Sequence, residues 1–218
     1  MLFEMQVLTY ASVIPISDKH HISSTATLRN FHSRQGPAVN VTVLDAMMIT
    51  LASPPLFSPT SITKDSSTFE YVSGDLTRSN PIRAIIAEAH GAFAPEGHVA
   101  CLLSVGCGHS GANPVPDGSS ISQWNEFLGK MATDSENEAQ QVSSQMANLR
   151  LYHRFSVNLG LELSSPSKKM TSESIVTQTS IYLDDLGLTE KVDHCSELLR
   201  IRDGTASLEQ LSEWHTHV

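Results

Sequence analysis

Residues Phe69 to His90 read FEYVSGDLTRSNPIRAIIAEAH and combine two periodicities across one turn. The first part is a short β-type run that breaks at Gly74-Asp75, a pair of residues typical of turns. Asn80 is a favoured N-cap and Pro81 a favoured first helical residue, so a helix is expected to begin there. Its apolar residues recur at helical spacing and predict one core-facing stripe: Ile82, Ile85, Ile86, Ala89 and Phe93. A strand that leads through a tight turn into an amphipathic helix is typical of α/β proteins.

The N-terminal side of this stretch carries further strand and helix signals. A helix over Val43–Leu51 is predicted, because Thr42 can cap it and Asp45 can complete a capping box. The two prolines at 54 and 55 then stop the helix. Two strands are expected before it, at Met5–Ile14 and Ser24–Ser33.

The C-terminal side begins with Val99–Val105, a nearly continuous apolar run. Such a run is typical of a strand covered on both faces, as in a parallel sheet, and Ser104 within it is expected to be a core hydroxyl bonded to the backbone. The later elements expected are a helix face of Ile121, Trp124, Leu128 and Met131, a second face of Ala139, Val142, Met146 and Leu149, a strand within 151–160, a linker at 164–169, and helices over about 171–186, 189–202 and from 207 onward. The fold class is therefore α/β with a helical C-terminal third.

Composition excludes several classes of protein. The net charge of -9 argues against a nucleic-acid partner, which would need clustered Lys and Arg. Three cysteines without paired spacing indicate reduced thiols and a cytoplasmic protein. The first residues show no secretory signal and no segment is long and apolar enough to span a bilayer, so the sequon at Asn40 is expected to be a chance match.

Residues Gly106 to Gly111 form a literal G-x-G-x-x-G directly after the apolar strand. A dinucleotide site would need a helix to open at once, so that its N-terminal amides face the pyrophosphate. Here Asn113 and Pro114 follow instead, and we interpret the segment as a tight turn that leaves the sheet. The chain contains no G-x-S-x-G, and hence no nucleophile elbow. No cofactor is expected.

The histidines do not predict a metal site. His20 with His21, and His109 near Cys107, lack the paired spacing of zinc ligands. Surface or loop histidines are the simpler interpretation, so no metal ligand is assigned from the sequence.

Four blocks of the chain, taken in their order and spacing, resemble the C-terminal half of a patatin-like phospholipase domain, most closely the fungal forms of that family. The resemblance covers about residues 5 to 112 and extends more loosely to about 165. The blocks are Asn30–Arg34 (NFHSR), Thr42–Phe57 (TVLDAMMITLASPPLF), Tyr71–Pro81 (YVSGDLTRSNP) and Ala100–Gly108 (ACLLSVGCG).

The resemblance implies a three-layer α/β/α fold and a lipid acyl hydrolase with a Ser–Asp dyad. In the family the serine lies in an upstream G-x-S-x-G beside a glycine-rich oxyanion loop, and the aspartate opens a D-G-G or D-G-A triplet before the Asn-Pro helix. In this chain the triplet is Ser73-Gly74-Asp75, so Ser73 stands in the acid's place. On an extended segment Asp75 would be displaced by about 6–7 Å along the strand, too far for proton transfer. We expect Asp75 to be a turn residue or local cap, with a surrogate base as the alternative, and Asn80 and Pro81 to start the helix.

The resulting expectation is a partial patatin-like domain at 1–165, lacking its N-terminal half, followed by a helical extension at 166–218. It is expected to be catalytically inactive as it stands, with no catalytic residue assigned. The alternative is a non-catalytic binding or regulatory module of a larger multidomain protein. A third hypothesis is an active enzyme that pairs Asp75 with a serine elsewhere, Ser104 and Ser110 being the candidates. The partners expected are a lipid or membrane surface, another protein, or a second copy through an exposed sheet edge.

Overall fold

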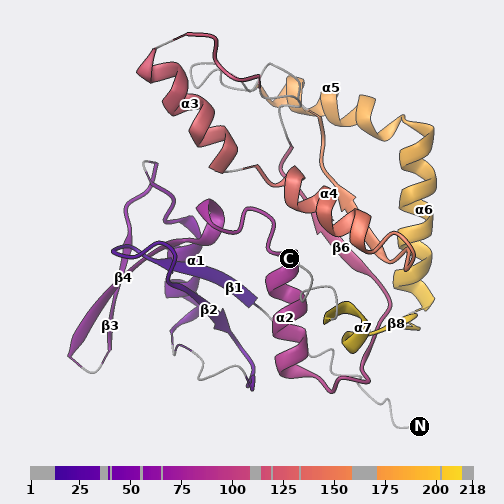
Figure 1. Ribbon diagram of the computed structural model, residues 1–218, viewed down its shortest axis with the longest axis horizontal. Coiled ribbons are helices and arrows are strands. Elements are labelled where there is room, and N and C mark those ends of the chain that lie inside the picture. The colour runs from indigo at the N-terminus through magenta and orange to yellow at the C-terminus, as the bar shows by residue number, and fades with distance from the viewer. Residues whose placement is uncertain are drawn as a thin grey trace. The chain divides into compact units, whose positions relative to one another are not determined.

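The computed structural model describes residues 13–34, 39, 41–54, 56–64, 66–108, 114–118, 120–132, 134–158, 171–201 and 203–212. These residues form a mixed α/β structure of helices and small sheets (Figure 1). The structure divides into two compact units. One comprises the described residues up to Thr77 together with Ala87–Ala92, and the other comprises Arg78–Ile86 and the described residues from Phe93 onward.

The first unit is built on a four-stranded antiparallel sheet in the order β2-β1-β4-β3. Strand β1 pairs with β2 through Val13↔Arg29 and with β4 through Ile16↔Ser73, so β2 and β3 are the edges of the sheet. The strands are β1 (Val13–Asp18), β2 (Thr25–Arg29), β3 (Thr60–Lys64) and β4 (Ser67–Ser73).

Helix α1 (Val43–Leu51) packs against this sheet and closes the core of the unit. Ile49 of the helix is fully buried and clusters with Ile16 and Leu28 from β1 and β2. The predicted capping box is confirmed: the Thr42 hydroxyl accepts from the Asp45 amide, and the Asp45 carboxylate accepts from the Thr42 amide. These hydrogen bonds from Thr42 hold the pKa of Asp45 below its ordinary value.

The second unit contains two short strand pairs and most of the helices. Strand β6 (Leu102–Val105) runs parallel to β7 (Tyr152–Phe155), with Leu103 opposite His153. Strand β5 (His98–Val99) pairs antiparallel with β8 (Ala206–Ser207). The helices are α3 (Ile121–Ala132), α4 (Glu136–Gln145), α5 (Ser172–Leu183), α6 (Leu186–Ile201) and α7 (Leu208–Ser212).

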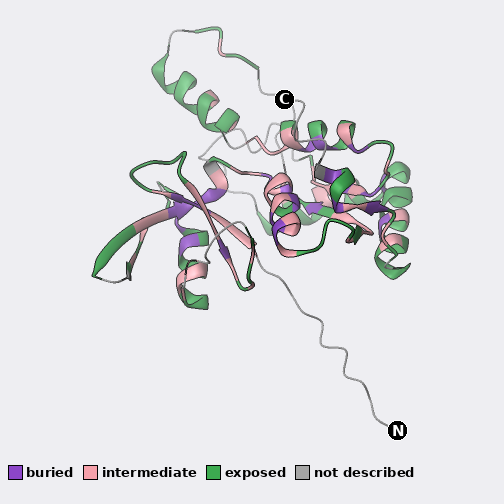
Figure 2. Ribbon diagram, turned by 60° about the horizontal axis from the view of Figure 1, so that its bottom comes forward, coloured by how far each residue is buried: buried purple, intermediate pink, exposed green. Residues whose placement is uncertain are grey.

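Burial in the second unit follows the apolar periodicity of some helices and not of others (Figure 2). The predicted face of α4 is confirmed, because Ala139, Val142 and Met146 are buried. Helix α3 has no buried residue among those described, so its predicted apolar face lies on the surface. The three C-terminal helices are present, with the break between α5 and α6 at residues 184–185.

Three expectations about the elements need correction. Strand β1 (Val13–Asp18) continues beyond Ile14, where the predicted strand ends, and the first residues of that prediction lie outside the described part of the chain. The stripe on α2 (Ile82–Ala92) is only partly buried: Ile82 and Ile86 are in the core, whereas Ile85 is exposed. Strand β6 is not covered along its whole length on both faces, since Val105 is 73% exposed.

No helix of the described residues is both long and apolar enough to cross a lipid bilayer. The predicted boundary between 165 and 166 lies outside the described residues. Helix α2 belongs to both units: its first five residues are counted with the second unit and its last six with the first.

Candidate functional site

A serine–aspartate pair lies in the first unit, between the end of α1 and the end of β4. The Ser53 hydroxyl donates a hydrogen bond to the Asp75 carboxylate, with 2.5 Å between Oγ and Oδ2. Both residues are half-buried. Asp75 therefore holds the hydroxyl of a serine 22 positions earlier in the chain, and this pair is the candidate site.

Local sequence explains why these two side chains meet. Helix α1 ends with Ala52 as its C-cap, and the carbonyl of Ala52 accepts a hydrogen bond from the Ser73 amide at 2.9 Å. This bond fixes the turn after the helix against the last residue of β4. Gly74 then lets the chain pass close to β1, because a Cβ there would lie 2.6 Å from the Pro15 carbonyl oxygen. Asp75 follows in a short 3₁₀ turn, Gly74–Leu76.

The geometry of Asp75 differs from the expectation. Gly74–Leu76 is not extended, so the predicted displacement along a strand does not apply. The Ser73 hydroxyl caps the 3₁₀ turn by accepting from the Asp75 amide at 3.3 Å, and Ser73 is buried. The expected local capping thus comes from Ser73, while the Asp75 carboxylate binds Ser53.

The pair has the serine–carboxylate hydrogen bond that activation of a nucleophile requires. It does not lie at the start of a helix, where backbone amides usually stabilise an oxyanion. Ser53 lies just past the C-terminal end of α1, where the helix dipole is negative and opposes an oxyanion. Its own amide donates to the Leu51 carbonyl, and its carbonyl accepts from the amides of Leu56 and Phe57. Ser53 is therefore fixed in a hydrogen-bonded turn that leads away from a helix, whereas a nucleophile elbow leads into one.

Sequence reasoning did not identify Ser53 as the partner of Asp75. It named Ser104 and Ser110 as candidates, yet Ser110 lies outside the described residues and Ser104 binds other groups. The one sequence signal for Ser53 was its place in the segment Ala52-Ser53-Pro54-Pro55, which lies within the matching block Thr42–Phe57.

Asn80, Pro81 and Ser104 belong to the second unit, where a polar network surrounds them. The Ser104 hydroxyl donates to the Asn80 carboxamide oxygen at 3.2 Å and accepts from Arg154 at 3.0 Å. Ser104 is buried as expected, but these bonds are to side chains, not to the backbone. Helix α2 begins at Ile82, directly after Pro81, and the Asn80 amide group donates to the Tyr152 hydroxyl at 3.4 Å. The Asn80 carboxamide thus links β6 and β7, and the helix begins two residues after it.

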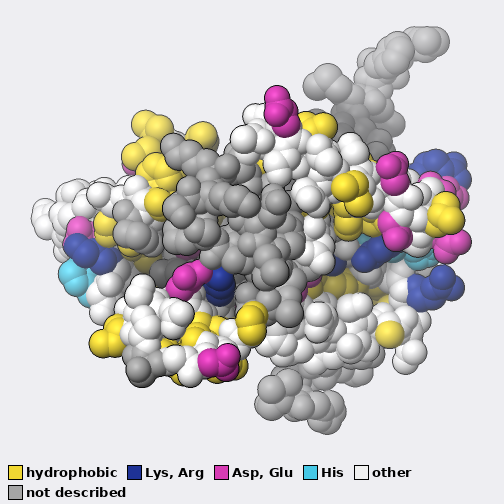
Figure 3. Space-filling model, turned by 90° about the horizontal axis from the view of Figure 1, so that it is seen from above, with side chains coloured by type: hydrophobic (Ala, Val, Ile, Leu, Met, Phe, Trp, Pro, Cys, Tyr) yellow, Lys and Arg dark blue, Asp and Glu magenta, His cyan; other side chains and the backbone are white. Residues whose placement is uncertain are grey.

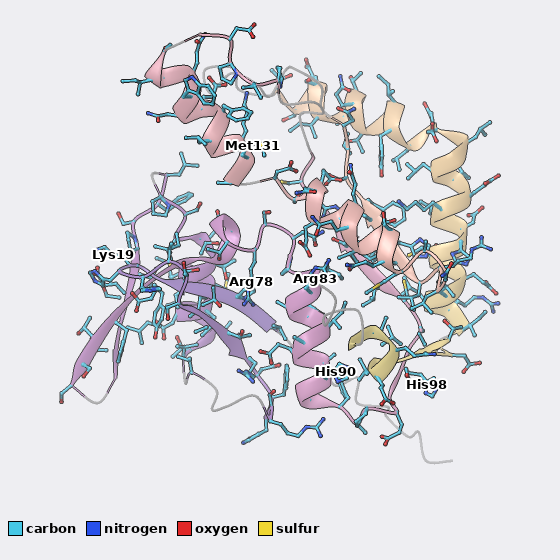
Figure 4. The ribbon with its side chains drawn as sticks, in the orientation of Figure 1. Lys19, Arg78, Arg83, His90, His98 and Met131 are labelled. Carbon is cyan, nitrogen blue, oxygen red and sulfur yellow. The ribbon has the colours of Figure 1, made fainter. Side chains whose placement is uncertain are left out.

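Charged side chains extend this network around β7 and α4. Arg154 donates to the Glu136 carboxylate at 2.7 Å and to the Ser135 hydroxyl at 2.8 Å. Arg83, on the first turn of α2, binds Glu138 and also donates to Gln145 at 2.8 Å (Figure 4). Every charge in this network has a hydrogen-bonded partner, which is the arrangement of a structural core.

The glycine-rich segment leaves β6 as irregular chain with a bend at Cys107, and the rest of the predicted turn, from residue 109, lies outside the described residues. A Cβ at Gly106 would lie 2.6 Å from the Arg154 guanidinium, so this glycine allows close packing against the network. Gly108 has a φ of 104°, a conformation that favours glycine.

The histidines divide between surface and interior. His20 and His21 are exposed as expected, and His20 lies 3.3 Å from the Glu70 carboxylate. His109 lies outside the described residues. The sequence did not indicate a buried group that the second unit brings together, formed by Cys101, His153 and Cys195. No short motif links these residues, because they lie on three elements far apart in the chain.

Comparisons with known proteins do not assign this chain to a family. The resemblance to patatin-like domains depends on the four blocks quoted above and on nothing else. No protein-family model, no curated protein and no solved structure matches this chain.

Proposed function

We propose that this chain is part of a patatin-like lipid acyl hydrolase domain and that the polypeptide described here does not itself hydrolyse esters. The four matching blocks support the family. The loss of activity is supported by Ser73 at the acid's position and by a sequence without a G-x-S-x-G. The three-layer fold of the family is part of this proposal.

The observation that carries the proposal is the environment of the Ser53–Asp75 pair. An attacking serine needs backbone amides directed at the developing oxyanion, and these are usually supplied at the start of a helix. Ser53 instead follows the end of one, and its amide is bonded to Leu51. We infer that the pair is a structural latch, which ties the turn after α1 to the turn after β4.

An esterase assay with short-chain acyl esters tests the proposal. We expect no turnover above background from the purified chain, nor from the S53A and D75N variants. Turnover that a serine-directed phosphonate abolishes, that S53A removes and that S61A retains would overturn it. Ser61 is the control because it is an exposed serine on β3 of the same unit.

A second candidate function, a non-catalytic module that docks a protein partner, is favoured by the surface of α1. Five apolar side chains of this nine-residue helix are between 51% and 79% exposed: Val43, Leu44, Met47, Met48 and Leu51. Monomeric proteins rarely leave such a contiguous apolar surface uncovered. Apolar side chains also gather in several places on the face shown in Figure 3.

Charge favours a protein partner over a membrane for this surface. Helices that lie on membranes carry Lys and Arg on their polar face, whereas the only charged residue of α1 is Asp45, and the net charge of the chain is -9. We expect concentration-dependent binding of a protein partner or of a second copy, and no sedimentation with lipid vesicles. The double variant L44Q/M48Q should weaken association, while L128Q on α3 should not. Sedimentation with vesicles that L44Q/M48Q abolishes would favour a lipid surface instead.

A further inference from the structure

Three potential metal ligands meet inside the second unit: Cys101, His153 and Cys195. Their ligand atoms all lie within 4.8 Å of one another, and the two sulfur atoms are 3.8 Å apart. His153 and Cys195 are only 5% and 4% exposed. The group is independent of the Ser53–Asp75 pair, which lies in the first unit.

The strand register and the helix pattern explain the convergence. Residue 101 immediately precedes β6, and the parallel register places Leu103 beside His153, so Cys101 and His153 share one face of the strand pair. Helix α6 lies against that face (Figure 1), because its His194 ring contacts the His153 ring with centroids 5.1 Å apart. Cys195, the next residue, and Leu188, two turns earlier, are the buried residues of α6.

The spacing of the sulfur atoms fits two thiolates on one tetrahedral metal ion. With Zn–S bonds of about 2.3 Å, two sulfur ligands at a tetrahedral angle lie about 3.8 Å apart. A disulfide would require about 2.05 Å, and all three cysteines of the chain are free thiols. Two thiolates and an imidazole are a ligand set that Zn²⁺ prefers, and hard ions such as Mg²⁺ or Ca²⁺ disfavour it.

The hydrogen bonding of His153 suits a ligand. One ring nitrogen, Nε2, lies 3.2 Å from His194 Nδ1, and the other, Nδ1, is buried without a hydrogen-bond partner. A buried ring nitrogen with no partner is costly unless something else binds it.

We propose that Cys101, His153 and Cys195 bind one zinc ion, with a water molecule in the fourth position. The ion would join β6, β7 and α6 and so stabilise the second unit.

Cobalt and zinc titrations of the full chain test the site directly. The purified protein is reduced, stripped of metal with a chelator, and titrated with Co²⁺, which reports tetrahedral thiolate ligation by visible and near-ultraviolet absorption. We expect saturation at one Co²⁺ per chain and displacement by Zn²⁺. Bound zinc should also protect two of the three thiols from alkylation and leave Cys107, which is exposed, reactive.

Single substitutions assign the ligands. C195S and H153Q should abolish the cobalt spectrum, and C107S should leave it unchanged as the matched control. H194Q should retain binding, since the fourth position is assigned to water. Circular dichroism of each variant identifies any that do not fold. If a variant does not fold, the thiols that zinc protects from alkylation in the wild-type chain identify the cysteine ligands.

Two outcomes would overturn the proposal. One is the lack of stoichiometric Co²⁺ or Zn²⁺ binding by the reduced wild-type chain. The other is binding that C195S leaves intact, which would place the metal elsewhere. A Cys101–Cys195 disulfide that forms in the purified chain and persists under mild reduction would also contradict it, because the two sulfurs would then be unavailable as ligands.

Discussion

At the scale of the residue, Gly74 shows how one missing side chain permits the junction of two strands. A Cβ at this position would lie 2.6 Å from the Pro15 carbonyl oxygen and 2.9 Å from its carbon, and both are backbone atoms that cannot turn aside. We expect Gly74→Ala to lower the free energy of unfolding by about 1–3 kcal/mol through overpacking. Urea denaturation measures the change.

Gly129 is the matched control for this substitution. It lies inside α3, and a Cβ there would have no neighbour within 4 Å. Gly129→Ala should therefore stabilise the chain by about 0.5–1 kcal/mol, because alanine is the better helix former. If both variants changed stability in the same direction, the proposed clash at Gly74 would be wrong.

The Ser53–Asp75 hydrogen bond permits a second prediction at this scale. Removing one partner of a half-buried bond to a carboxylate should lower the free energy of unfolding, and about 1–2 kcal/mol is expected for Ser53→Ala. The double variant S53A/D75A should lose less than the sum of the single variants, by about 0.5–1 kcal/mol. Additive losses in denaturation experiments would show that the two side chains do not interact in solution.

Local residue patterns were predictable when both partners lie within one turn. Thr42 and Asp45 are three positions apart, so helix geometry alone brings them together. Ser53 and Asp75 are brought together by the packing of α1 on β4, which no local pattern encodes. The side-chain partners of Asn80 were not predictable for the same reason, because its carboxamide binds residues on β6 and β7.

At the scale of the element, an ion pair joins β2 to the second half of α2. Arg29 and Glu88 are 3.2 Å apart, and both side chains are less than a tenth exposed. Removing one charge leaves the other buried without compensation, so Arg29→Met should cost about 3–5 kcal/mol. The double variant R29M/E88L should recover much of this loss, because an apolar pair avoids the desolvation of both charges.

Thermal denaturation of these variants can be compared with that of Arg200→Met. Arg200 pairs with Glu197 on α6 at 2.7 Å, but both side chains are largely exposed. Solvent screens such a pair, so little change is expected. A loss for Arg200→Met as large as that for Arg29→Met would contradict the assignment of the stabilising effect to burial.

Apolar periodicity predicted where most helices and strands lie better than it predicted which of their faces are buried. The buried face of α4 and the positions of α1 and β7 follow from apolar spacing, which is a local property. The continuous apolar run in β6 suggested cover on both faces, yet Val105 is exposed. The elements that cover the faces of a strand are distant from it in sequence. The apolar run therefore predicted the strand but not the elements that pack on it.

At the scale of the whole molecule, stability should depend on pH through His153. Burial lowers its pKa below the ordinary value of 6.5, so the unfolded chain binds a proton that the folded chain resists. Stability from this group is fully present above pH 6.5 and is lost as the pH falls further. The midpoint of urea unfolding of the metal-free chain should therefore decrease between about pH 7 and pH 5.5.

His153→Gln should make this dependence shallower, because glutamine does not titrate. His194 and Lys191 of α6 face the same ring and remain in the variant. The carboxylates whose pKa is lowered are Asp45, Glu70 and Glu197, and all three stay ionised in this range. An unchanged slope in the variant would show that His153 is not responsible.

The α/β class follows from the sequence, but the division into two units does not. Alternating strand and helix signals suffice for the class. The units are defined by contacts between distant segments, and each of them is made of two separate stretches of the chain. The cluster of Cys101, His153 and Cys195 has the same origin, because its members are spread over almost half of the chain.

Because the first unit needs the second half of α2, it cannot be completed during synthesis until that helix has emerged. Glu88 leaves the ribosome after all four strands of the first sheet, so Arg29 on β2 has no ion-pair partner until then. Strand β6 also lacks its partner at first, because β7 is translated about fifty residues later. A nascent chain halted between these points would expose an unpaired strand, and a chaperone that recognises such segments would be expected to bind there.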